Sequence, residues 1–118
     1  MQITIEIPDG EILNLAKEIM QNMPECSLSL RCVGWKYEKG IYVFVDEDDE
    51  DDIGKRYTVT VEEIAAKGLK TFIEKTVQGE YQFCGCANLE NVLDACCYDA
   101  DIIDTIIQLT IFGKVIYG

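Results

Sequence analysis

A run of seven consecutive acidic residues, at positions 46–52, most constrains how this chain can fold. Adjacent carboxylates repel one another and Asp is a poor strand former, so the run cannot lie inside a regular, buried element. Residues 41–45 before the run are predicted as a hairpin strand, and residues 55–60 after it alternate polar and apolar side chains. The sequence therefore predicts that the run is a loop between two strands.

The acidic run also carries most of the net charge. Ten Lys and Arg residues against 22 Asp and Glu residues give a formal net charge of −12, which would be −5 without the seven charges of the run. Because affinity for phosphates comes from clustered Lys and Arg, this balance argues against direct nucleic-acid binding and against binding to anionic membranes. It permits a basic protein partner or a metal cation.

Strand patterns lie mainly in the first half of the chain. Residues 2–7 alternate polar and apolar side chains, and residues 28–32 do so within a more ambiguous stretch. Lys39-Gly40, between residues 35–38 and 41–45, predicts a hairpin turn. We therefore expect several short strands joined by tight connections.

Helical spacing of apolar side chains predicts four helices, at residues 12–23, 61–77, 88–98 and 102–112. Thr60 and Glu63 have the spacing of a capping box, in which each side chain bonds to the backbone N–H of the other residue. Gly68 costs about 1 kcal/mol relative to Ala inside a helix. Close packing of another element against Gly68 would explain its presence.

The ends of the last helix are marked by particular residues. Asp99 or Asp101 caps its start, and Gly113 stands where a left-handed residue ends a helix. Residues 115–117 form either a closing strand or an extended tail. Because strands and helices are segregated along the chain, we predict a single α+β domain over residues 1–118, with a small antiparallel sheet of three to five strands packed on one face by three to four helices.

The acidic run allows three interpretations. Carboxylate oxygens suit calcium, but no register of the run places both the Gly and the ligands that an EF-hand loop requires. A row of carboxylates can instead imitate a phosphate backbone and enter the basic groove of a nucleic-acid-binding protein. The third interpretation is a solvated loop that maintains solubility. The partner-binding interpretation assigns contact roles to Asp46, Glu47, Asp48, Asp49, Glu50, Asp51 and Asp52.

Aromatic residues of the predicted sheet could add apolar contact beside the acidic run. Tyr and Trp are enriched at protein interfaces, although core packing is the usual role of aromatic side chains in a sheet. Alternation places Trp35 and Tyr37 on the same face of their strand, and Tyr42 and Phe44 on the same face of theirs. It does not show which face of the sheet is buried. We predict partner contacts for Tyr42, Phe44 and Tyr57.

The six cysteines do not have the spacing of a metal site. Cys84 and Cys86 are separated by one residue, whereas Cys96 and Cys97 are adjacent, and structural zinc ligands are usually two to four residues apart. The chain has no His to complete a mixed site. We expect reduced thiols, most of them in the core, with no metal and no cofactor.

Catalytic motifs are lacking in the sequence. Without His the commonest general base is missing, and the chain has no phosphate-binding glycine loop or zinc-protease motif. Asp101 and Asp104 could act as an acid and base pair, but charge favoured by the helix dipole is the simpler explanation for them. We expect a protein that is not an enzyme.

The sequence gives no sign of membrane targeting. Residues 1–8 lack the basic and apolar regions of a secretory signal, and no stretch approaches the roughly 20 apolar residues that span a bilayer. We expect a cytoplasmic protein.

Residues 99–118, DADIIDTIIQLTIFGKVIYG, resemble the end of small proteins from phages and prophages of gut-type bacteria. In these proteins an acidic, apolar helix leads into Phe-Gly and a short Tyr-Gly tail. The resemblance covers about a sixth of the chain and includes no chemical motif. It implies an accessory protein of a mobile element, of a kind that often acts by binding host machinery.

Together these features predict a small acidic inhibitor or adaptor that binds a basic protein, for example a nucleic-acid-binding protein, by nucleic-acid mimicry. One alternative is a protein that binds cations through the acidic run or the cysteines. Another is a structural or regulatory homodimer, in which the run serves solubility.

Overall fold

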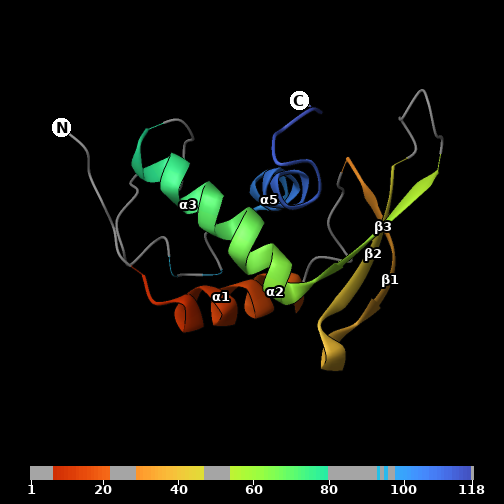
Figure 1. The fold of residues 1–118 in the computed structure, drawn as a ribbon, viewed down its shortest axis with the longest axis horizontal. Helices are drawn as coiled ribbons and strands as arrows, with labels where there is room; N and C mark the ends of the chain where they lie inside the picture. The colour runs from red at the N-terminus through yellow and green to blue at the C-terminus, as the bar shows by residue number, and fades with distance from the viewer. Residues whose placement is uncertain are drawn as a thin grey trace.

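The computed structural model describes residues 7–21, 29–46, 54–79, 93, 95 and 98–117. Figure 1 shows a sheet at one end of the molecule and the helices together on one side of it, which confirms the predicted α+β class. The predicted strand at residues 2–7 and the predicted helix at residues 88–98 lie largely outside the described residues. The elements in chain order are α1 (Asp9–Gln21), β1 (Arg31–Lys36), the 3₁₀ turn η2 (Tyr37–Lys39), β2 (Ile41–Asp46), β3 (Lys55–Thr60), α2 (Val61–Glu63), the π-helical η3 (Ile64–Leu69), α3 (Lys70–Val77) and α5 (Ala100–Phe112).

The described sheet has three antiparallel strands in the order β1-β2-β3. The hairpin between β1 and β2 was predicted, but its turn is longer than Lys39-Gly40, because η2 follows directly after Lys36. Gly40 closes the turn with a φ of +62°, and a Cβ there would lie 2.6 Å from Cγ1 of Val61. Before this turn, the single strand β1 stands where separate strands were expected at residues 28–32 and 35–38.

The two faces of the sheet differ in burial. Along β2, Tyr42, Phe44 and Asp46 point to the inner face, toward the helices, and each is at most 2% exposed. The alternate residues point to the opposite, outer face, where Ile41 and Val43 are half-buried and Val45 is buried. The period of two along a strand explains this division.

A continuous helical segment, α2 with η3 and α3, follows β3 directly. Thr60 and Glu63 form the predicted capping box, each accepting a hydrogen bond from the backbone N–H of the other. Gly68 lies where this segment meets α5, and a Cβ at Gly68 would lie 2.5 Å from the carbonyl oxygen of Ile106. The glycine therefore allows two helices to approach closely, as expected from its position.

The ends of α5 also follow the predicted signals. Asp99, one of the two predicted caps, accepts a hydrogen bond from the N–H of Ile102. Gly113 ends the helix in the left-handed conformation, with a φ of +74°. The chain then turns back as an extended tail, residues 115–117, rather than as a strand.

Candidate functional site: the hairpin end and the C-terminal tail

The strands β2 and β3 meet at the point where the acidic residues begin. Asp46 pairs with Lys55 in the last register position of the ladder. The N–H of Gly54 donates a hydrogen bond to the carbonyl oxygen of Asp46, at 2.9 Å. The remaining acidic residues, 47–52, are called the acidic segment below; they lie outside the described residues. The structure thus defines the residues on either side of the acidic segment, Asp46 before it and Gly54 after it.

Asp46 belongs to the core and not to the exposed loop that the sequence predicted. Its side chain is 1% exposed, and its two carboxylate oxygens lie 2.9 and 2.7 Å from the hydroxyl of Tyr117, which donates to them. The strand register explains the difference, because Asp46 follows Tyr42 and Phe44 on the inner face. Asp46 is therefore removed from the predicted partner contacts.

Gln108 of α5 holds the tail that carries Tyr117. Its Oε1 accepts hydrogen bonds from the N–H groups of Ile116 and Tyr117, at 2.9 and 2.8 Å. Its Nε2 donates to the carbonyl oxygen of Tyr117 at 3.0 Å and to the carboxylate of Asp104 at 3.1 Å. Gln108 is fully buried. One amide side chain therefore satisfies its whole polar capacity while fixing the tail to the helix.

Asp104 extends this network to the segment before β1. Its carboxylate accepts hydrogen bonds from the N–H of Ser29 at 2.9 Å and from the Ser29 hydroxyl at 2.8 Å, besides the bond from Gln108. Asp101, which was considered as its acid–base partner, is exposed in the first turn of α5. We call the connected set Ser29, Asp104, Gln108, Tyr117 and Asp46 the polar seam.

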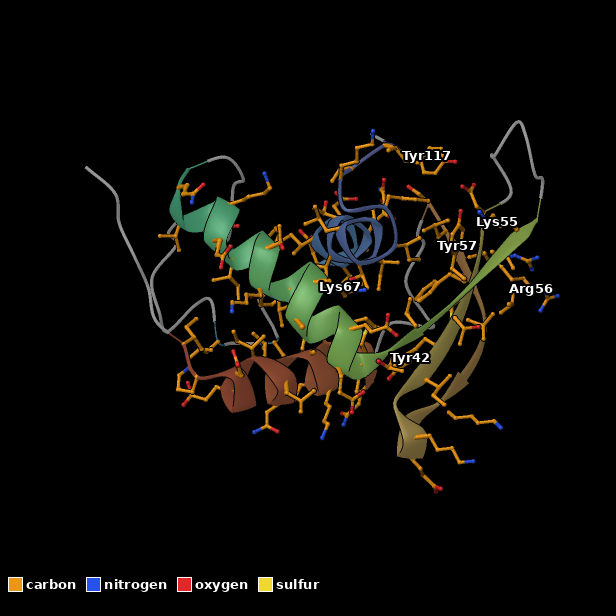
Figure 2. The ribbon with its side chains drawn as sticks, in the orientation of Figure 1. Tyr42, Lys55, Arg56, Tyr57, Lys67 and Tyr117 are labelled. Carbon is orange, nitrogen blue, oxygen red and sulfur yellow. The ribbon has the colours of Figure 1, made fainter. Side chains whose placement is uncertain are left out.

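The three predicted aromatic contacts have different environments. Tyr42 and Phe44 are 2% and 0% exposed, so their rings have no surface to offer a partner, and both are removed from the predicted contacts. Tyr57 is half-buried, and its ring meets that of Phe112 edge to face, with 5.6 Å between centroids. The ammonium of Lys55 lies 5.2 Å from the centroid of Tyr57. Figure 2 shows Tyr57 pointing toward α5 and Tyr117 above it, close to the hairpin end.

The described residues give no sign of a metal centre or of a membrane span. Within that part of the chain, no three acidic, Cys or His side chains are grouped to hold a metal ion. No described helix has the length and apolar character needed to cross a bilayer. Cys32 is half-buried, and burial raises the pKa of its thiol, against the opposing effect of backbone hydrogen bonds with Gly34 and Val43. The other five cysteines lie outside the described residues.

Some surface depressions lined by described residues lie away from the hairpin end. One, of about 270 Å³, lies between α1, η2 and the start of α2; another, of about 240 Å³, lies between α1 and η3. Small-molecule sites usually measure about 300–1,000 Å³. Both depressions are smaller, and we do not assign a ligand to either.

No family model, curated protein or solved structure matches this chain. The site is therefore assigned from its own residues. The polar seam was not predicted from the sequence, although one signal was present. Asp104 and Gln108 interrupt an apolar helix four residues apart, which places both on one side of it.

Proposed function

We propose that the protein is a non-enzymatic binding module that presents the acidic segment to a basic surface of another protein. One observation carries this proposal: the hairpin closes directly at the segment, through the Asp46–Lys55 pair and the hydrogen bond from Gly54. Six carboxylates stand in the sequence between these two strand ends. Concentrated charge of one sign accelerates the approach of an oppositely charged partner and orients it.

The polar seam supports this role by fixing the base of the segment. Asp46 is tied to Tyr117, and Gln108 ties the tail to α5, so the end of β2 is held by the C-terminal tail, which α5 holds in turn. A base that is already ordered has less conformational freedom to lose when a partner binds. In this proposal Asp46 anchors the segment, and the contacts come from Glu47, Asp48, Asp49, Glu50, Asp51 and Asp52.

Apolar side chains close to the hairpin end extend the proposed contact surface. Val115 and Ile116 are 39% and 45% exposed and directly precede Tyr117, which reaches Asp46. Tyr57 is also partly exposed. Interfaces commonly combine an apolar centre with a charged margin, and in this proposal Val115, Ile116 and Tyr57 supply the apolar part.

The proposed partner is a basic, nucleic-acid-binding protein whose phosphate groove accepts the row of carboxylates. The resemblance of residues 99–118 to phage and prophage proteins is consistent with an inhibitor or adaptor that acts on host machinery in the cytoplasm. Such binding depends strongly on salt, because it rests on charge pairs close to solvent.

Capture from bacterial lysate tests the proposal. Wild type is compared with a segment-neutral variant, in which residues 47–52 carry Asn for Asp and Gln for Glu. We expect wild type to retain a basic protein at low salt and to release it at high salt, and the variant to retain none. The matched control neutralises six exposed acidic residues elsewhere: Glu11, Glu18, Glu38, Glu62, Glu74 and Asp101. Equal capture by wild type and the segment-neutral variant would overturn the proposal.

A further inference from the structure

The outer face of the sheet differs in charge from the rest of this acidic protein. Cross-strand register places three rows of residues side by side on it, and none of these residues is acidic. The cations stand at the margins, and the apolar residues of β2 run along the centre. We call this set the outer face: Arg31, Val45 and Arg56; Gly34, Val43 and Thr58; Lys36, Ile41 and Thr60.

The outer face is accessible where its charges lie. Lys36, Arg56 and Thr58 are exposed, Ile41 and Val43 between them are half-buried, and Val45 is buried. In Figure 1 the described helices all lie on the other side of the sheet, and in Figure 2 Arg56 points away from them. The face thus combines an apolar centre with cationic margins, as protein interfaces commonly do.

Charge complementarity indicates an acidic occupant, and this chain contains one. The acidic segment holds six adjacent carboxylates, whereas the outer face carries the exposed cations Lys36 and Arg56, and the carboxylate of Glu63 at its Thr60 end is engaged in the capping box. We propose that the outer face binds the acidic segment of a second copy of this chain. The proposal rests on the segment being a binding element, as proposed above, and adds a second copy as its partner.

Two arrangements satisfy such a contact. Each molecule offers one segment and one face, so two copies can exchange these contacts reciprocally in a two-fold dimer, or each can bind the next head to tail in a ring or a chain of copies. A basic partner would compete with it for the segment. Self-association would then keep the segment covered until that partner is present.

Salt should affect this association in two opposing ways. Two molecules with a net charge of −12 repel each other at long range. At about 0.15 M salt the screening length is roughly 8 Å, which weakens that repulsion and leaves adjacent opposite charges attracting. At about 1 M it is roughly 3 Å, and the attraction is largely lost. Association is therefore expected to be strongest at intermediate salt.

The first test measures the mass of the purified protein as a function of concentration, by light scattering and sedimentation. We expect the mass of wild type to rise with concentration at intermediate salt. Reversing charge on the outer face with Lys36→Glu and Arg56→Glu should raise the dissociation constant about tenfold or more. The control variant, Lys17→Glu with Lys70→Glu, changes the net charge equally on exposed helix positions and should associate like wild type.

Mixing variants identifies the two surfaces directly. The segment-neutral variant keeps its outer face, and the variant with Lys36→Glu and Arg56→Glu keeps its segment. Each is expected to be monomeric alone, and the mixture is expected to form a dimer through the one remaining matched contact. A monomeric wild type, association unaffected by charge reversal of the face, or a mixture that stays monomeric would each overturn the proposal.

Two further measurements separate this inference from the proposed function. A monomeric wild type that captures a basic protein through the segment would overturn self-association and support the proposed function. In the second measurement, a monomeric wild type binds a polyglutamate peptide, and the variant with Lys36→Glu and Arg56→Glu does not. That result would assign the outer face to an acidic partner other than this chain and overturn the proposal of a second copy.

Discussion

The two sides of α5 are both buried, but different kinds of contact hold them. On one side, Ile106 and Thr110 pack against the helical segment at Gly68. On the other side, Asp104 and Gln108 belong to the polar seam. Residues two positions apart on a helix point roughly 200° apart, so the two pairs lie on opposite sides of α5. Close packing therefore holds one side of α5, and hydrogen bonds hold the other.

The difference shows what each side demands of the sequence. The steric side requires only that nothing larger than a hydrogen stand at Gly68. The polar side requires complete pairing, because a buried polar group without a partner costs about 1–3 kcal/mol. Substitutions on the two sides should therefore differ in how far their effects spread through the molecule.

The largest effect is expected from Gly68→Leu. A Leu side chain would meet the backbone of α5 at Ile106, so the two helices would have to separate. We expect a loss of about 3 kcal/mol or more in the free energy of unfolding, measured by urea denaturation. Ala66→Leu, at an exposed position of η3, is the control and should change stability little. Equal stability of the two variants would show that the helices do not approach closely.

A smaller and more local effect is expected from Gln108→Leu. Leu has a similar volume but makes none of the hydrogen bonds to Asp104, Ile116 and Tyr117. We expect the free energy of unfolding to fall by about 2 kcal/mol. The loss is limited because the polar groups of the tail can form hydrogen bonds with water instead. Hydrogen exchange should show the N–H groups of Ile116 and Tyr117 losing protection, while η3 stays protected. Protection lost equally on both sides would contradict the independence of the two contacts.

Much of the fold follows from local signals in the sequence. The capping box at Thr60 and Glu63 and the left-handed Gly113 were predicted, because each depends on residues near in sequence. Close packing was only an explanation offered for Gly68, and the structure supplies it. The turn after β1 was misplaced, since η2 has no strong turn residue before Gly40. Local chemistry therefore predicts helix ends better than strand ends here.

The site was harder to predict because it joins distant residues. Asp46 and Tyr117 lie 71 positions apart, and nothing in the sequence pairs them. Alternation puts Asp46 on the same face as Tyr42 and Phe44, but membership of the acidic run favoured a loop. No prediction was made for Gln108, which is buried and holds the tail.

Tyr117→Phe tests the link between the polar seam and the hairpin end. The substitution keeps the ring that packs against Phe112 and removes the hydroxyl that donates to Asp46. We expect a loss of about 1.5 kcal/mol, since the bond is made to a buried carboxylate. A double-mutant cycle with Asp46→Asn measures the coupling of the pair. If the two single losses add without coupling, the hydroxyl does not stabilise the end of β2 through Asp46.

The smallest effect is expected from Asp99→Ala, at the exposed start of α5. Its carboxylate accepts one hydrogen bond from the N–H of Ile102, so the loss should be about 1 kcal/mol, and Asp99→Asn should retain most of the cap. The cap lies at the end of α5 rather than on either side of it. The packing against Gly68 and the hydrogen bonds of the polar seam should therefore weaken together. Hydrogen exchange should therefore show the amides of η3 and of the tail losing protection in equal proportion. Selective release of the tail would mean that the polar seam depends on the first turn of α5, where Asp104 must be held toward Ser29.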